Sequence, residues 1–403
     1  MKHCHRKIPL TALIVLVAVG AAAEVPRVTN GAEPRDGMAE LQLEEIWRHG
    51  GIDDEEVLFG LVTSVVTDDE GNLYVLDAQL AEVMVFSPDG EFLRTIGRQG
   101  SGPGEFQTPQ QLAMLPGGGV GVTQMFPGKL VGLNLDGTPL GDVTIGDATA
   151  GEFAVLINVA SGGGNLVVSG MELGFDQATM SQDRHMFVRS YDLDGTMQQE
   201  YVSGDQTWVF DSSFVLRETE SDFVWWRLAV DHQGRVVVGE PREDYEISVY
   251  AADGTLQRVF GREYETLERT EAIKARFRAM LDAQTGQLPP GTETEVAERA
   301  QDIWGIHCHA DGSYWVTSSR GMYEPPEGAL VMWDVFSPEG EFVRQVHAKV
   351  PGQPGTDRLL LTDHGYAVKI TGFWDAVLSA MGAGGQSEEA EPMEIVCYRI
   401  GEM

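Results

Sequence analysis

An all-β fold made of six copies of one four-stranded unit is predicted by three features of the sequence. Short runs of alternating apolar residues fill most of the chain, glycine turns separate them, and the same order of strand and turn recurs from residue 67 onward. The first turn of each unit contains Gly71, Gly118, Gly164, Gly234, Gly312 or Gly365, and the second, in five units, contains Gly90, Gly137, Gly195, Gly254 or Gly340. Such turns supply the positive φ angles that hairpins need. Four-stranded units at this spacing are typical of a six-bladed β-propeller.

The first unit shows the order of its elements most clearly. In "TDDEGNLYVLDAQLAEVMVFSPDGEFLRTIG", from Thr67, a turn is followed by two alternating strands, a second turn and a last strand. We name the strands a to d, with strand a just before the first turn. The next stretch, "GRQGSGPGEFQTP" from Gly97, has the glycines of a phosphate-binding loop, but strands rather than a helix follow it. We interpret this stretch as the crossover to the next unit, with Phe106 filling apolar space between the blades.

These two stretches resemble the repeats of NHL-type (NHL/TolB-like) six-bladed propellers, and in particular secreted bacterial proteins known only as six-bladed β-propellers. The resemblance is strong over the first unit and its crossover, and weaker but regular over the other five. Related propellers include metal-dependent lactonases and amidoglycolate lyases, which hold calcium or zinc in the central channel. The resemblance therefore implies a metal-dependent hydrolase or lyase as the alternative function. The sequence shows no signature of those metal sites, and a calcium set would have to come from Asn158, Glu240 and Asp77.

The sixth unit indicates how the ring closes. It ends in "MEIVCYRI", a strand c with no strand d behind it, and residues 39–47, "AELQLEEIW", resemble the strand d sequences of the other units. We expect residues 39–47 to complete blade six, because closing the ring removes an edge that would otherwise pair with other chains.

The N-terminus predicts export. Lys2, Arg6 and Lys7 precede an apolar run over residues 8–20, and a small-residue cleavage site ends at Ala23, as in a secretory signal peptide. We expect residues 24–403 to form a secreted or periplasmic monomer without a membrane span. The net charge of −34 repels nucleic acid and anionic lipid. Cys308 and Cys397 lie in strand-like runs, where a buried apolar role is favoured over a disulfide.

The long insertions predict which face of the propeller carries the function. Strands alternate in direction within a blade, so the b–c and d–a loops emerge on one face, and every long insertion belongs to these two loop classes. The longest, residues 262–300 between blades four and five, has apolar residues at helical spacing around Phe277. We expect a first helix there and a second one after residue 290, with Thr292 or Thr294 as its cap. Function on repeat scaffolds tends to lie in such loops.

A ring of side chains around the channel mouth forms the candidate ligand-binding site. Residues just before strand a are Ser64, Gln111, Trp226, Arg227, Trp304 and Arg358, and residues at the end of strand b are Asp77, Glu240, Arg242 and Arg320. Aromatic rings, guanidinium groups and carboxylates together suit a small polar or anionic ligand, or a protein partner. Packing between blades and salt bridges between loops explain any one of these residues better than a ligand does, so the binding hypothesis rests on the ring as a group. No catalytic constellation stands out and no cofactor is predicted, so the favoured function is binding.

Histidines near the opposite face suggest a second, weaker hypothesis. His307 and His309 alternate on one strand, so their imidazoles could share a zinc ion with a third ligand, and His232 and His364 occupy neighbouring turns. His309, however, takes the place that Asp68 and Asp231 occupy in other blades, at the end of strand a. The polarity of that turn explains the histidine better than a metal does, and the sequence predicts no metal site.

Overall fold

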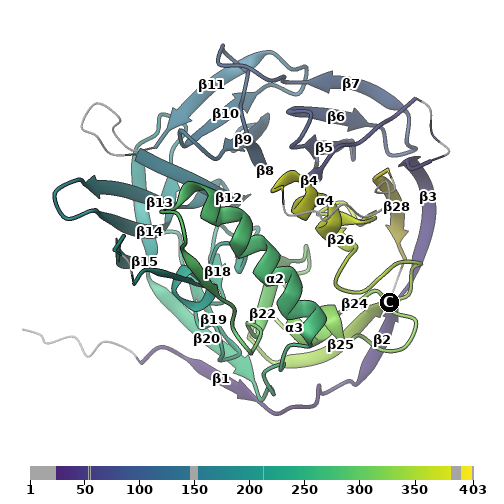
Figure 1. Cartoon of the computed structure of the whole chain (residues 1–403). Helices are drawn as coiled ribbons and strands as arrows, with labels where there is room; N and C mark the ends of the chain where they lie inside the picture. The colour runs from purple at the N-terminus through teal and green to yellow at the C-terminus, as the bar shows by residue number, and fades with distance from the viewer. Residues whose placement is uncertain are drawn as a thin grey trace, which may run out of the picture.

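The computed structural model describes residues 24–52, 54, 56–145, 153–211, 213–382 and 392–401, and shows six antiparallel sheets arranged around a central axis (Figure 1). Blade one contains β4 (Val62–Thr67), β5 (Leu73–Asp77), β6 (Glu82–Phe86) and β7 (Phe92–Ile96). Blade two contains β8 (Pro109–Met114), β9 (Val120–Gln124), β10 (Lys129–Leu133) and β11 (Pro139–Thr144). Blade three contains β12 (Phe153–Gly162), β13 (Asn165–Asp176), β14 (Ser181–Tyr191) and β15 (Met197–Val209).

The second half of the chain forms three more blades with the same topology. Blade four contains β17 (Leu228–Val230), β18 (Val236–Val238), β19 (Glu246–Tyr250) and β20 (Leu256–Arg262). Blade five contains β22 (Ile303–Cys308), β23 (Tyr314–Ser318), β24 (Val331–Phe336) and β25 (Phe342–Ala348). Blade six contains β26 (Arg358–Leu361), β27 (Tyr366–Ile370) and β28 (Glu394–Ile400), and its fourth strand comes from the N-terminal part of the chain. The predicted six-bladed propeller is therefore confirmed.

The crossover from blade one to blade two shows how the glycine-rich stretch is used. Phe106 is fully buried in an apolar cluster with Leu76 of blade one and Leu112 of blade two. Gly97 has a φ of 70°, and a Cβ atom at this position would collide with the Phe106 ring. The glycine thus permits both the chain reversal and the close approach of the aromatic ring, and the stretch is a crossover as the sequence predicts.

The N-terminal segment, residues 27–50, runs around the outer rim of three blades, and we call it the belt (Figure 1). β1 (Arg27–Asn30) pairs in parallel with β20, and β2 (Met38–Leu41) pairs in parallel with β25. β3 (Leu43–Gly50) pairs antiparallel with β28 and completes blade six. The strand that completes blade six is therefore Leu43–Gly50 rather than residues 39–47.

The shift of this strand has a physical reason in two apolar anchors. Leu41 is buried in a cluster with Trp315 and Trp333 of blade five, whereas Trp47 is buried in a cluster shared by blades one and six. The chain changes blades between these anchors, at Gln42. The alternating pattern that reads as one strand in the sequence belongs to two strands on different sheets.

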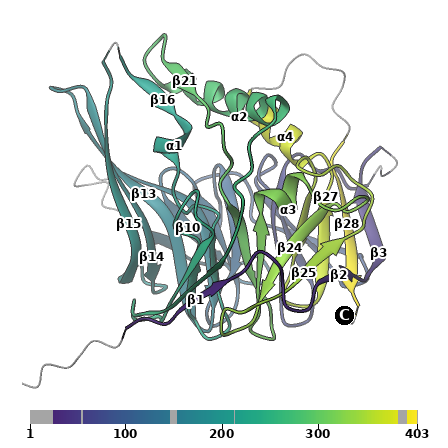
Figure 2. The ribbon, with the colours of Figure 1, turned by 90° about the horizontal axis from the view of Figure 1, so that it is seen from below.

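The insertions lie on one face of the propeller, which is the upper face in Figure 2. They contain β16 (Val215–Arg217), α1 (Glu218–Ser221), α2 (Glu271–Gln284), the 3₁₀ turn η1 (Thr285–Gln287), β21 (Glu293–Glu295), α3 (Ser319–Tyr323) and α4 (Phe373–Ala380). The Thr270 side chain caps α2 by accepting a hydrogen bond from the Ile273 N–H.

The prediction of a second helix in the insertion after blade four is wrong. Residues 293–295 form β21, which pairs in parallel with β16. The β-branched residues Thr292, Thr294 and Val296 alternate here, a pattern that suits an extended strand against a partner better than a helix.

Two further features concern export and redox state. The expected signal peptide, residues 1–23, lies outside the described residues. Within the described ranges, no helix has the length and apolar character needed to cross a membrane. Cys308 and Cys397 are both buried and both free.

Candidate functional site

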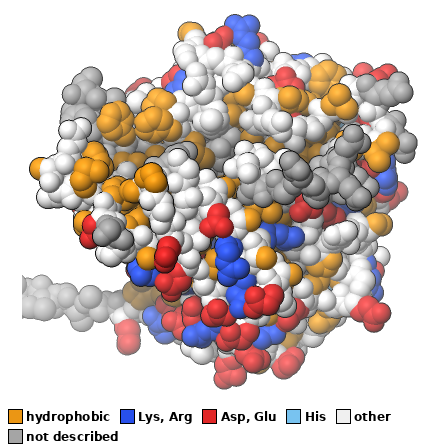
Figure 3. Space-filling model, viewed as in Figure 1, with side chains coloured by type: hydrophobic (Ala, Val, Ile, Leu, Met, Phe, Trp, Pro, Cys, Tyr) orange, Lys and Arg blue, Asp and Glu red, His pale blue; other side chains and the backbone are white. Residues whose placement is uncertain are grey.

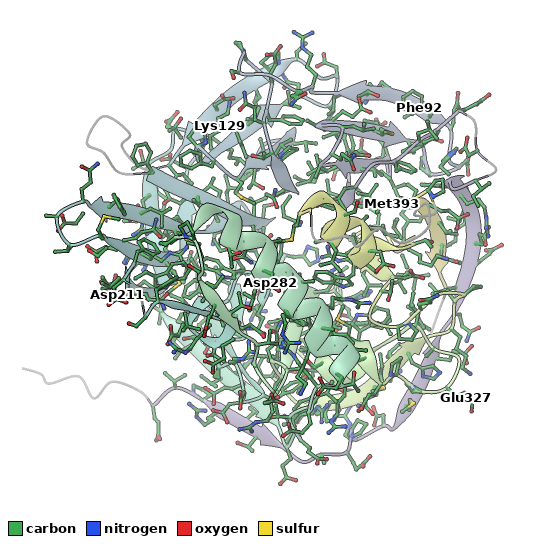
Figure 4. All side chains as sticks on the ribbon, in the orientation of Figure 1. Phe92, Lys129, Asp211, Asp282, Glu327 and Met393 are labelled. Carbon is green, nitrogen blue, oxygen red and sulfur yellow. The ribbon has the colours of Figure 1, made fainter. Side chains whose placement is uncertain are left out.

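The channel mouth on the face with the insertions is covered by two helices. α2 and α4 extend over the central part of the ring when it is viewed along its axis (Figure 1). α2 starts in the insertion after blade four and is attached to the segment before blade six, where Arg276 donates to the Gly355 carbonyl and to Thr356 Oγ1. Met393 lies beside α4 (Figure 4). The candidate site therefore lies between these helices and the inner strands.

A group of five charged side chains occupies the blade-four side of the mouth, and we call it the Glu218 cluster. Its members are Glu218, Asp222, Arg227, Arg242 and Arg269. The Glu218 carboxylate accepts hydrogen bonds from Arg269 at 2.6 and 2.7 Å, from Arg242 at 2.9 Å and from the Ala297 N–H at 3.1 Å. These guanidinium contacts hold the pKa of Glu218 below its ordinary value against the opposing effect of burial. The cluster ties the insertion to blade four.

Two of the predicted cationic donors are members of this cluster. Arg227 is 2% exposed and forms two parallel hydrogen bonds with Asp222, at 3.0 and 2.9 Å, while its Nε donates to the Gly239 carbonyl at 2.8 Å. Arg242 is shared between Glu218 and Asp222. Carboxylates of the protein itself occupy both guanidinium groups, so their structural role is explained without a ligand.

The residues considered for a calcium site each have other partners. The Asp77 carboxylate is fully buried and accepts four backbone hydrogen bonds, from Gly60, Leu61, Gln79 and Leu80, at 2.6 to 3.1 Å. The Glu240 carboxylate accepts from the Tyr250 hydroxyl at 2.5 Å, and the Asn158 amide donates to the Trp225 carbonyl at 2.9 Å.

These three side chains therefore hold loops and strands in place. In the part of the chain that the structure describes, no group of three or more His, Cys, Asp and Glu side chains has an arrangement that could bind a metal.

Arg320 and Trp226 are both partly exposed. Arg320 of α3 forms ion pairs with Glu324 at 2.7 Å and with Glu265 at 3.6 Å, and its Nε donates to the Glu265 carbonyl. Trp226 is 39% exposed. Acidic and basic side chains are mixed over the lower part of this face, whereas hydrophobic side chains are exposed toward blades two and three (Figure 3).

Four aromatic side chains from four different segments meet around Trp304, and we call them the Trp304 cluster. The ring centroid of Trp304, on β22, lies 6.2 Å from Phe277 of α2, 6.1 Å from Tyr323 of α3 and 5.8 Å from Trp374 of α4. The Nε1 atoms of Trp304 and Trp374 are buried, and neither has a hydrogen-bond acceptor among the described residues. The cluster brings apolar ring surface and two unused donors to the mouth.

The sequence predicts Trp304 as a site residue but not its neighbours. It predicts Phe277 only on the apolar face of a helix, and makes no prediction for Tyr323 and Trp374. Trp374 lies in "TGFWDAVLSAM", in the long insertion of blade six, where a pair of aromatic residues outside any strand was the available signal.

Arg358, at the start of β26, lies next to the Trp304 cluster and differs from the arginines of the Glu218 cluster. Its Nη1 donates to the Thr63 carbonyl at 3.3 Å, and its Cζ lies 5.1 Å from the ring centroid of Phe373. Phe373 in turn makes an edge-on contact with Trp374, at 5.2 Å between centroids. Among the described residues, no carboxylate lies within ion-pair distance of Arg358. Burial lowers its pKa to about 10.

The histidines lie toward the opposite face. His307 Nε2 is buried without a described partner, and burial lowers the pKa of this imidazole to about 4. His309 pairs with Asp311 at 3.1 Å and stacks on Trp315 at 5.7 Å. His364 bonds to the Thr67 hydroxyl at 2.8 Å. These contacts are those of turn and packing residues.

Two cavities lie away from the mouth. One, of about 310 Å³, lies on the sheet of blade three and is lined by Glu172, Leu173, Gly174, Asp183, Arg184, His185, Asp205, Gln206 and Thr207. The other, of about 870 Å³, lies between blades one and two at the a–b turns, on the face without insertions, and its lining includes Asp68, Glu70, Arg94 and Asp136. No residue predicted for the site lines either cavity.

Comparison with known proteins gives matches to other propellers. A family model described as "6-bladed beta-propeller" matches residues 54–142, which contain blade one and most of blade two. None of the curated proteins matches the sequence. Among solved structures, a Bacteroides fragilis protein is 12% identical and covers 94% of this chain and 100% of its own, with a TM-score of 0.49. Virginiamycin B lyase from Staphylococcus aureus is 11% identical and covers 90% of this chain and 100% of its own, with a TM-score of 0.43.

The sheet topology and the family match agree. Six four-stranded blades surround one axis, and the matched segment contains the glycine turns and the crossover that carried the resemblance in the sequence. The chain is a six-bladed β-propeller.

Proposed function

We propose that this propeller binds a small polar or anionic ligand at the channel mouth beneath α2 and α4, and that it acts outside the cytoplasm as a binding protein without chemistry of its own. The expected signal peptide supports the location. The main observation that supports binding is the Trp304 cluster, because side chains from α2, β22, α3 and α4 converge there.

Two properties of the cluster support a ligand rather than packing alone. Aromatic side chains form large, rigid surfaces that bind rings and apolar groups. Buried polar groups in folded proteins nearly always have hydrogen-bond partners, so an unpartnered buried donor needs an explanation. Two indole N–H groups without described acceptors lie within one aromatic cluster. A ligand that carries oxygen atoms and a ring would supply both the acceptors and the stacking partner.

Binding can be tested with the chain of residues 24–403 and a defined panel. The panel contains benzoate, glucuronate, glucose, benzamide and a short neutral peptide, and binding is measured by calorimetry and by tryptophan fluorescence. We expect at least one small molecule to bind, and Trp304→Ala to weaken it at least tenfold, because buried aromatic anchors carry much of the binding energy of a site. Trp374→Phe keeps a ring but removes the N–H donor, and a smaller loss is expected.

A matched control separates the mouth from the rest of the surface. Phe175 of blade three is 54% exposed, and Phe175→Ala is expected to leave the affinity unchanged. If no panel member binds, or if binding persists equally in Trp304→Ala, the proposed site is wrong. Binding of the peptide alone would instead favour a protein partner.

A further inference from the structure

We propose that the Arg358 guanidinium is the receptor for the carboxylate of a ring-bearing monocarboxylate, with the ring held against Trp304 and Trp374. This inference rests on the proposed function, because it assigns a ligand class to the same mouth. It is based on the position of Arg358 and on nearby hydrogen-bond donors that have no described partner.

Among the residues that the structure describes, few groups use the hydrogen-bonding capacity of Arg358. A guanidinium carries five N–H donors. The described contacts of Arg358 are one hydrogen bond to the Thr63 carbonyl and a face contact with Phe373. The remaining donors are available for a planar anion, and a carboxylate matches the fork of a guanidinium with two parallel hydrogen bonds.

Arg358 differs from the arginines of the Glu218 cluster in having no described carboxylate partner. Arg227, Arg242 and Arg269 each contact a carboxylate at 2.6 to 2.9 Å. The chain has 62 acidic and 28 basic residues, so carboxylates are abundant. A partly buried cation without a counter-charge is unfavourable, because desolvation is not offset by an ion pair. A site that binds an anion explains why this position carries a cation that has no counter-charge in the described part of the chain.

Three more donor atoms lie along the same wall. Thr63 Oγ1, Trp304 Nε1 and Trp374 Nε1 are buried and have no partner among the described residues. Thr63 is 9% exposed, and its carbonyl accepts the hydrogen bond from Arg358. The contacts from Thr63 through Arg358 and Phe373 to Trp374 and Trp304 are continuous. The wall therefore offers one positive charge, several donors and aromatic surface to a single ligand.

The charge and shape of the ligand follow from this surface. The net charge of −34 repels multiply charged anions more than singly charged ones. The aromatic side chains around Trp304 favour a ring next to the carboxylate, and both an aromatic ring and a sugar ring stack on indole. The expected ligand is a ring that carries one carboxylate. Aromatic and sugar rings are tested separately.

The experiment measures affinity for charged and neutral partners of the same shape. Benzoate is compared with benzamide, glucuronate with glucose, and inorganic phosphate serves as an anion without a ring. For the native chain we expect benzoate or glucuronate to bind at least tenfold tighter than its neutral partner and tighter than phosphate. Whichever carboxylate binds tighter identifies the ring as aromatic or sugar.

Variants assign the preference for the carboxylate to one residue. Arg358→Met is expected to remove that preference, bringing each carboxylate to within about twofold of its neutral partner. Arg358→Lys keeps the charge but not the fork, and should retain a partial preference. Arg184 is a matched control, because it too lies over an aromatic ring, Trp208, and its pKa is also lowered to about 10 by burial. Arg184→Met should leave the preference unchanged.

The outcomes separate this inference from the proposed function. If ligands bind and depend on Trp304, but the preference for carboxylates is absent or survives in Arg358→Met, this inference is wrong while the binding function stands. If phosphate binds tighter than both carboxylates, the assigned ligand class is wrong. If nothing binds to the native chain, both fail. Circular dichroism of each variant establishes that it is folded, and Arg358→Lys provides the same test if Arg358→Met does not fold.

Discussion

The two sides of the channel mouth use arginine differently. On the blade-four side, three guanidinium groups share the carboxylates of Glu218 and Asp222, and on the blade-six side Arg358 lies against Phe373 without a described carboxylate. Both sides belong to loops of the same class on the same face. The comparison shows that residue type and loop position do not distinguish a structural arginine from one available to a ligand. The partners within the fold make that distinction.

The largest effect on stability is expected on the blade-four side, when the Glu218 cluster loses its shared carboxylate. Glu218→Ala would leave Arg269 and Arg242 without their shared carboxylate, and breaking a buried ion pair by removing one partner costs about 3–5 kcal/mol. Urea denaturation of the native and variant chains measures this loss. Glu220, two residues away in α1, forms an exposed pair with Arg217, so Glu220→Ala should cost less than about 1 kcal/mol. Equal losses in the two variants would contradict the difference between buried and exposed pairs.

A second test concerns a buried carboxyl group near Trp304. Asp302 is 2% exposed, and burial raises its pKa to about 6, with Asp244 and Glu243 adding to the shift. Because the folded pKa lies above the unfolded value of about 3.9, the folded state holds this proton more tightly. The stabilisation is complete below about pH 4 and is lost as the pH rises to about 6.

Asp302→Asn should remove this dependence on pH. We expect the variant to be more stable than the native chain at pH 7 by about 1–3 kcal/mol, since one pKa unit corresponds to about 1.4 kcal/mol. Urea denaturation at several values between pH 4 and 7 measures the difference. Asp194→Asn, in an exposed turn of blade three, is the control. If the curves of Asp302→Asn and the native chain remain parallel over this range, the carboxyl group is not the cause.

The smallest effect on stability is expected on the blade-six side, at Arg358. Arg358→Met replaces a partly buried cation that has no described counter-charge with an apolar side chain of similar length. Without ligand, the free energy of unfolding should change by less than about 1 kcal/mol, or rise slightly. The same urea series measures it. A loss as large as that of Glu218→Ala would mean that Arg358 has a structural partner, and the contrast between the two sides would not hold.

The fold could be predicted because its signals are local. The turn glycines of all six blades have positive φ angles, so each turn is encoded by residues next to it. The belt was placed less accurately, because a strand added in parallel at the outer edge of a blade leaves the same local pattern as one that completes a blade. Leu41 and Trp47 are anchored in different clusters, and that difference depends on residues of blades one and five.

The candidate site was predicted less well for the same reason. Arg227 and Arg358 both lie at the start of a strand a and Arg242 follows a strand b, and the sequence gives no sign of which of them meet carboxylates. Arg269 and Glu218 are 51 residues apart, and they meet because the insertion folds back over blade four. Pairing over such distances depends on the whole chain, whereas the positions that ring the mouth follow from the repeat.

The belt sets a constraint on the order in which the ring can assemble. β3 is synthesised well before its partner β28, because the contact between Arg48 and Glu394 spans 346 residues. The entropy lost in closing a long loop has to be offset before such a contact contributes stability, so non-local strand pairing folds slowly. Blades one to three can form while the chain is still growing. Blade six, by contrast, is completed only when the two ends of the chain meet, which makes ring closure a late step in folding.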